Sequence, residues 1–173
     1  NNNTVWAILR DKRNSLWCCT SDGISRFEGS KFTNYGIRDG LSARIVYAAC
    51  EDHKGRIWFG TTGGVSVFDG ENFTNYLYEN GQMGKDVTSI VQDRSHTIWF
   101  ATKNGLYSLT DTLFTKYTTD DGLSNNNLFS LVIDDNDHLW IGTRAGINYY
   151  DGKKFHKIFV DKAGNAVSVT YTL

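Results

Sequence analysis

The stretch Leu16-Trp17-Cys18-Cys19-Thr20 decides the fold, because the same phrase returns three more times along the chain. The three later copies are Ile57-Trp58-Phe59-Gly60-Thr61, Ile98-Trp99-Phe100-Ala101-Thr102 and Leu139-Trp140-Ile141-Gly142-Thr143. The tryptophans of the four copies are spaced 41 residues apart. A fixed period of this size indicates a repeat architecture. Each copy is apolar on both alternating faces, which is typical of a strand that is covered on both sides. We therefore predict one central strand per repeat, inside a small sheet between neighbouring sheets.

The rest of each repeat reads as three more short strands. In the first copy the four strands are expected at residues 4–11, 16–20, 24–28 and 31–35. Turn signals separate them: a glycine recurs after the central strand, at Gly23, Gly64, Gly105 and Gly146. The last two strands are joined by two-residue hairpin signals, Glu28-Gly29, Asp69-Gly70 and Asp151-Gly152, which the third copy replaces with Thr110-Asp111. No copy shows the helical period that a solenoid of helices would need.

These patterns predict an all-β chain, a β-propeller built from four blades of about 41 residues with four strands each. One position near the start of each blade stays small, which fits strands that crowd toward a common axis (Ala7, Ala48, Ser89 and Ser130). We expect a single partial propeller domain over residues 1–173, with blades at about 4–35, 45–76, 86–117 and 127–158. Residues 165–173 are expected to form an extra strand or a linker.

Several phrases resemble the repeat of the two-component regulator propeller family. They are Leu139-Trp140-Ile141-Gly142-Thr143, Gly64-Val65-Ser66-Val67-Phe68-Asp69-Gly70, Phe73-Thr74-Asn75-Tyr76 and Asp39-Gly40-Leu41-Ser42. The resemblance implies the extracytoplasmic sensor region of a bacterial hybrid histidine kinase, of the kind with which gut Bacteroides-type bacteria sense glycans. It also implies a periplasmic location, a membrane-anchored parent with about seven blades, and a kinase absent from this chain. The expected partners are an oligosaccharide, and either further blades of the parent or a second copy.

Composition excludes some classes of function. The net charge of −1, without blocks of like charge, argues against a nucleic-acid binder. No run of about 18 apolar residues is present and the start does not resemble a signal peptide, so we expect a soluble fragment, whether or not its parent is secreted or anchored. The three cysteines occupy core positions of the repeat (Cys18, Cys19 and Cys50). No cofactor and no metal is predicted.

Candidate binding residues lie where the repeats differ. If the first strand of a blade runs away from the connection that precedes it, that connection shares a rim with the turn after the central strand. Charged residues vary from blade to blade on this rim. In the connection into the third blade, Tyr78 could stack on a sugar ring, and Gln82 is nearby in sequence. The candidates are Arg44, Tyr78, Gln82, Lys85, Asp86, Lys103 and Arg144. For any one of them, a solvated loop residue is the competing interpretation.

Other functions have less support in the sequence. A propeller lyase or lactonase would need a base or a metal at the channel mouth, yet His53, His96 and His138 fall on the opposite rim and His156 on an outer strand. The acidic turn 134–137 lacks the glycine and the distal glutamate of a calcium loop. The repeated tryptophans are interpreted as core rather than as sugar platforms. We therefore expect no catalysis in this chain, and a protein-interaction propeller remains the alternative to a sensor.

Overall fold

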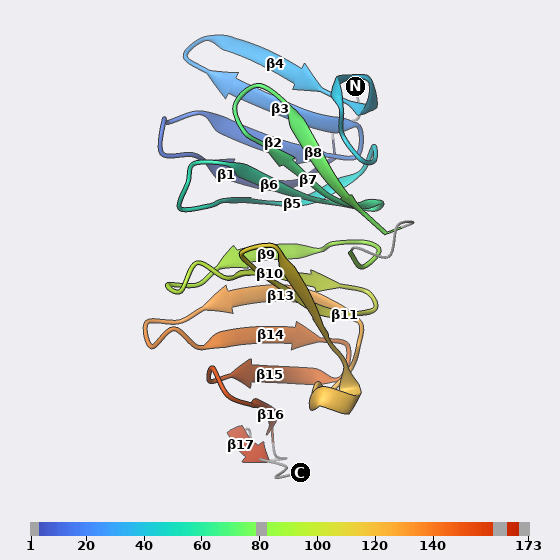
Figure 1. Ribbon diagram of the computed structural model, residues 1–173, viewed down its shortest axis with the longest axis vertical. Helices are drawn as coiled ribbons and strands as arrows, with labels where there is room; N and C mark the ends of the chain where they lie inside the picture. The colour runs from blue at the N-terminus through green and yellow to red at the C-terminus, as the bar shows by residue number, and fades with distance from the viewer. Residues whose placement is uncertain (1–3, 79–82, 161–165, 170–173) are drawn as a thin grey trace. The chain divides into compact units, whose positions relative to one another are not determined.

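The computed structural model describes residues 4–78, 83–160 and 166–169, and the chain divides into two compact units, Asn1–Ile90 and Val91–Leu173 (Figure 1). The first unit contains β1 (Val5–Arg10), β2 (Leu16–Thr20), β3 (Gly23–Glu28), β4 (Lys31–Tyr35), the 3-10 helix η1 (Ile37–Asp39), β5 (Val46–Glu51), β6 (Ile57–Thr61), β7 (Gly64–Phe68) and β8 (Phe73–Leu77). Strand β9 (Ser89–Gln92) spans the boundary. The second unit continues with β10 (Ile98–Thr102), β11 (Gly105–Thr110), β12 (Leu113–Tyr117), η2 (Thr119–Asp121), β13 (Leu128–Ile133), β14 (Leu139–Thr143), β15 (Gly146–Tyr150), β16 (Phe155–Val160) and β17 (Ala166–Val169).

Each repeat forms one sheet whose strands follow chain order. The sheets are β1-β2-β3-β4, β5-β6-β7-β8, β9-β10-β11-β12 and β13-β14-β15-β16-β17, which we call blades 1 to 4. The predicted all-β fold of propeller blades is confirmed. Within the described residues no helix has the length and apolar character needed to cross a membrane.

Strand β17 lies beside β16 as a fifth strand of blade 4. Val169 pairs with Lys157 and Ala166 with Val160, in antiparallel register. Residues 166–169 therefore extend the outer edge of their own blade instead of opening a further one. The remaining residues of the predicted 165–173 segment lie outside the described part of the chain.

The repeated tryptophans occupy the core, as predicted. Trp17, Trp58 and Trp99 are buried, and Trp140 of blade 4 is half-buried. In every blade the indole nitrogen donates to an aspartate six residues earlier, at 2.8–2.9 Å (Asp11, Asp52, Asp93 and Asp134). The other oxygen of each aspartate accepts backbone N–H groups of its own turn, for example those of Lys54 and Arg56 in blade 2. A buried indole N–H thus has its partner, and the same carboxylate holds the turn between the first two strands.

In blades 1 to 3 the glycine after the central strand is required by the close approach of the last strand. Gly23 has φ +94° and Gly64 has φ +127°, in the region that L side chains rarely adopt. A Cβ atom would also overlap the carbonyl oxygen of Tyr35 at Gly23 and that of Tyr76 at Gly64. The third blade keeps its outer hairpin without glycine, because Asp111 takes φ +55° itself.

The first strands of blades 1, 2 and 4 carry a β-bulge near their start. The pairing with the second strand shifts between Val5 and Ala7, between Val46 and Ala48, and between Leu128 and Ser130. The extra residues are all aromatic: Trp6, Tyr47 and Phe129. A bulge turns one side chain away from the alternation of the strand, so these three rings are aimed by the backbone itself.

Candidate functional site

Within each unit, the connection into a blade lies beside the turn after a central strand. The N–H of Gly23 donates to the Arg44 carbonyl at 2.7 Å, and that of Thr62 donates to the Ile45 carbonyl at 3.2 Å. In the second unit the N–H of Arg144 donates to the Asn127 carbonyl at 2.9 Å. We call this edge the loop rim of each unit. Among the described residues it holds the turns 21–22, 62–63, 103–104 and 144–145 and the connecting segments 36–45, 83–88 and 118–127.

The most developed feature of the loop rim is a pocket at the entry to blade 2. The connection folds into the 3-10 helix η1 because the Asp39 carboxylate accepts the N–H of Gly36 at 2.8 Å and Gly40 ends the turn at φ +109°. The pocket has a volume of about 320 Å³ and is lined by Asp22, Gly23, Gly36, Ile37, Arg38, Asp39 and Arg44. This volume lies within the range of small-molecule sites.

An ion pair forms one wall of this pocket. The Nε of Arg44 donates to Asp22 Oδ1 at 2.6 Å, and this hydrogen bond lowers the pKa of the Asp22 carboxyl. Arg38 and Asp39 also contribute to the lining, so its formal charges cancel. Ile37, which is largely exposed, adds an apolar surface. A hollow with one apolar side chain, two guanidinium groups and two carboxylates can hydrogen-bond a neutral polyhydroxyl compound.

The other predicted residues are distributed over the loop rims. Tyr78 is exposed, and its N–H donates to the Gly63 carbonyl at 3.0 Å. Lys85 is exposed, whereas Asp86 is half-buried with φ +52°. Lys103 and Arg144 are exposed in the β10–β11 and β14–β15 turns of the second unit. Gln82 lies outside the described residues. Of the candidates that the structure describes, Arg44 lines the pocket.

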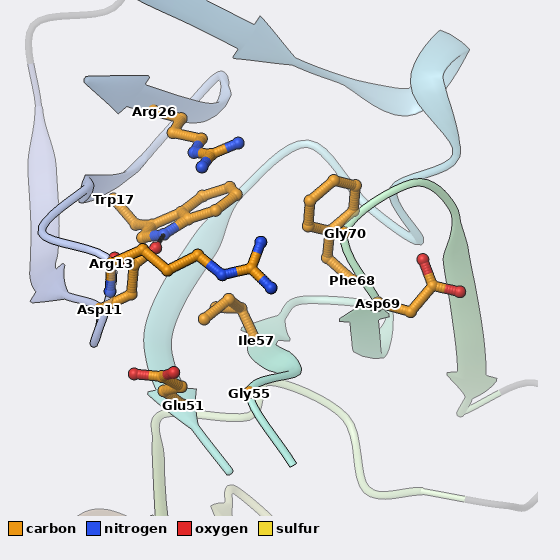
Figure 2. Close-up of a pocket in the computed structure, with 10 residues that line it drawn as sticks. All are labelled: Asp11, Arg13, Trp17, Arg26, Glu51, Gly55, Ile57, Phe68, Asp69 and Gly70. Carbon is orange, nitrogen blue, oxygen red and sulfur yellow. Dashed lines mark hydrogen bonds between the residues drawn. The ribbon is translucent and has the colours of Figure 1, made fainter. Parts of the chain in front are cut away.

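A second, smaller pocket lies on the opposite edge of the first unit. The guanidinium carbon of Arg26 lies 5.0 Å from the centroid of the Trp17 ring. Figure 2 shows Arg26 above this ring and Arg13 extending between Trp17 and Ile57. Its volume of about 40 Å³ has room for a few water molecules but not for a sugar ring. We interpret this pocket as a narrow packing gap between blades 1 and 2 rather than as a ligand site.

His156 and the acidic turn of blade 4, both considered in the sequence analysis, have hydrogen-bond partners away from the pocket beside η1. His156 Nε2 lies 2.7 Å from Asp151 Oδ2, and its ring stacks on Tyr149. That hydrogen bond, together with backbone N–H donors, lowers the pKa of Asp151. In the acidic turn of blade 4, Asp134 accepts the Trp140 indole N–H and the backbone N–H groups of Asn136 and His138. Across the described residues no group of three histidine, cysteine or acidic side chains could hold a metal ion.

Two features were missed by the sequence analysis. One is the pair of Trp6 and Tyr47, whose ring centroids lie 5.3 Å apart at 79°. The available signals were that Trp6 is the one tryptophan outside the 41-residue period, and that its aligned position is aromatic in three of four repeats. The other is the aspartate six residues before each tryptophan, a spacing that could have been noticed in all four copies.

Comparison with known proteins supports the repeat and the fold. The model of the two-component regulator propeller family matches residues 1–22, 40–63, 81–104 and 122–145, together more than half of the chain. None of the curated proteins matches the chain.

Similar solved structures include two extracellular domains assigned to hybrid two component systems of B. thetaiotaomicron. One has a TM-score of 0.81 and 22% identity and is aligned over 92% of this chain and 26% of its own. The other has a TM-score of 0.73 and 22% identity, over 91% of this chain and 22% of its own. A catalytically inactive histidine-to-alanine variant of virginiamycin B lyase from Staphylococcus aureus has a TM-score of 0.68 and 17% identity, over 99% of this chain and 58% of its own.

The chain spans about a quarter of the length of the two extracellular domains. At these identities the solved structures show the fold alone, and it is the fold of propeller blades. The family model, by contrast, matches the repeated phrase in all four blades. The matched residues include the four repeated tryptophans and the turns of the loop rim. The chain therefore belongs to the two-component regulator propeller family.

Proposed function

We propose that this chain is a non-catalytic, glycan-responsive sensing region in the periplasmic part of a membrane-anchored two-component sensor. Its role is to bind an oligosaccharide at the loop rim and to relay that binding to a kinase elsewhere in the parent. The observation that carries the proposal is the 320 Å³ pocket with the Arg44–Asp22 pair in its wall. Membership of the regulator propeller family supports the sensing role.

A panel of oligosaccharides immobilised as an array, followed by calorimetry on the best binder, tests the proposal. The double variant Arg44→Ala with Lys85→Ala is expected to weaken binding, since it removes two rim cations. Its melting temperature should stay close to that of the wild type, because exposed charges contribute little to stability. A wild-type protein that binds nothing on the array contradicts the glycan assignment, and a large thermal destabilisation of the variant assigns the pair to the scaffold instead.

The lyase alternative has weaker support. The inactive variant of virginiamycin B lyase identifies a histidine on which that enzyme's activity depends. Among the described residues, the pocket beside η1 is lined by no histidine, and its charged groups are two carboxylates, each of which accepts a hydrogen bond, and two arginines. A general base with a suitable partner is needed for elimination or hydrolysis. This favours binding over catalysis.

A protein-interaction role has one observation in its favour. Val5 of β1 is 49% exposed, whereas the residues at its position in the other blades are fully buried (Val46, Val87 and Leu128). Ile8 on the same strand is exposed as well. We infer that another blade covers this face, from the parent chain or from a second copy, because exposed apolar patches of this kind mark interaction sites. The isolated chain is then expected to self-associate. Light scattering that finds a monomer of 19.5 kDa at all concentrations would contradict this.

A further inference from the structure

We infer that Trp6 and Tyr47 form a stacking platform for a neutral saccharide ring, next to the pocket beside η1. The inference deepens the proposed function and rests on it. Trp6 is 52% exposed and Tyr47 is half-buried. Their strands, β1 and β5, lie side by side in the first unit (Figure 1), and the two rings meet edge to face.

The orientation of the Trp6 ring is fixed on both sides. Its indole Nε1 donates to Ser21 Oγ at 2.9 Å, and the Tyr47 ring packs against it. The bulge between Val5 and Ala7 turns the side chain out of the alternation of the strand. A large aromatic surface that is held in place without being covered loses little conformational entropy on binding, which suits it to stack on a sugar ring.

The platform and the pocket flank the same turn. Ser21 holds the Trp6 indole, and the next residue, Asp22, pairs with Arg44 in the pocket wall. Gly23 completes the turn and binds the Arg44 carbonyl. An oligosaccharide on this turn would place one ring on Trp6 and offer its hydroxyl groups to Asp22 and Arg44.

The balance of charged side chains around this turn indicates which class of saccharide it suits. The carboxylates of Asp22 and Asp39 balance the guanidinium groups of Arg38 and Arg44, and Trp6, Tyr47 and Ser21 are neutral. Sulfated and uronic-acid-rich glycans are recognised by an excess of cationic side chains, which this turn does not present. The platform is therefore assigned to a neutral oligosaccharide.

The same chain supplies a matched control. Phe129 occupies the equivalent bulge of blade 4 and has the same 52% exposure. Within the described residues it makes no aromatic ring contact, so it lacks the partner that Trp6 has in Tyr47. Phe129→Ala thus removes a ring of equal exposure from an equivalent backbone site.

Calorimetry with cellohexaose, mannohexaose and xylohexaose, and with a sulfated heparin hexasaccharide, tests the inference on the full chain. For the neutral hexasaccharide that binds best, Trp6→Ala should weaken affinity about tenfold or more, because aromatic truncation is among the costliest changes in a binding site. Trp6→Phe should recover much of the loss, and Phe129→Ala should bind like the wild type. Circular dichroism melts report on the folding of every variant.

Each outcome separates this inference from the proposed function. If the wild type binds a neutral hexasaccharide and Trp6→Ala binds it equally well, the platform is wrong while glycan binding stands. If Phe129→Ala weakens binding as much as Trp6→Ala, the effect is not specific to the platform, which overturns its assignment. Preferential binding of the heparin hexasaccharide overturns the neutral class. If the wild type binds none of the four, both the glycan function and the platform fail.

Discussion

The connections into blade 2 and blade 4 share one backbone design but end in different surfaces. Both contain a 3-10 helix, and in both an aspartate accepts the N–H three residues earlier (Asp39 from Gly36 at 2.8 Å, Asp121 from Thr118 at 2.7 Å). A left-handed glycine follows, with φ +109° at Gly40 and φ +107° at Gly122. The next residue inserts into the core in both cases (Leu41 and Leu123).

The side chains around the two connections differ at several positions, since Asp22, Ile37 and Arg38 correspond to Asn104, Thr119 and Asp120. The residue five positions after the aspartate differs as well. In the first connection Arg44 turns toward Asp22 and leaves the pocket open beside Ile37. In the second connection the equivalent residue is Asn126, whose Oδ1 accepts the N–H of Thr119 at 2.8 Å. The short amide side chain thus folds back on its own loop, whereas the long guanidinium reaches the neighbouring turn. Repetition determines the backbone of the connection, and the side chains that differ between the copies determine what the loop rim presents.

The largest expected effect on stability comes from truncating the buried leucine that the two connections share. Leu41→Ala and Leu123→Ala should each cost about 2–5 kcal/mol in the free energy of unfolding, because each removes a buried side chain from a blade core. Urea denaturation followed by tryptophan fluorescence measures both. A cost below about 1 kcal/mol for either would show that its connection is not anchored by the leucine.

A smaller effect is expected from the aspartates that support every blade. Burial raises the pKa of Asp52, but the hydrogen bonds from Trp58 and from the backbone and side chain of Arg56 outweigh it and leave this pKa below its usual value. A carboxylate with a lowered pKa stabilises the fold fully above about pH 4, the ordinary value for aspartate, and this stabilisation is lost as the pH falls through the lowered value.

The variant Asp52→Asn tests this account. It should cost about 1–3 kcal/mol at pH 7, since it removes a charged acceptor of several hydrogen bonds. Urea unfolding at pH 7, 5 and 3 should show a smaller acid-induced loss for the variant than for the wild type. Parallel losses in both proteins would mean that Asp52 does not contribute to acid sensitivity.

The smallest effect on stability is expected from exchanging Arg44 and Asn126, the residues five positions after the aspartate of each connection. Arg44→Asn and Asn126→Arg should each leave the free energy of unfolding nearly unchanged, because Arg44 is exposed and the hydrogen bond of Asn126 to Thr119 lies within its own loop. Arg44→Asn should nevertheless weaken saccharide binding, while Asn126→Arg should leave it unchanged. If both variants bound the saccharide as tightly as the wild type does, Arg44 would not be part of the binding site.

Much of the fold could be predicted from the sequence, because its repetition makes each copy a test of the others. The strand order, the turn glycines and the buried tryptophans of blades 1 to 3 follow from local pattern and period. The start of blade 3 was less predictable: the blade was expected from about residue 86, and its first strand, β9, begins at Ser89. The N–H of Val87 instead donates to the Thr61 carbonyl of blade 2, a contact between repeats that no single copy encodes.

The sequence by itself determined the family, the four blades and the positions where charged residues vary along the loop rim. Only the tertiary structure decided which of those residues meet. Trp6 and Tyr47 are far apart in the chain and belong to different repeats, and they touch because β1 lies beside β5 and a bulge redirects each side chain. The Arg44–Asp22 pair likewise joins two repeats. The physical reason is that a period specifies each blade by its own neighbours in sequence, whereas a binding surface forms between blades, from side chains that packing brings together.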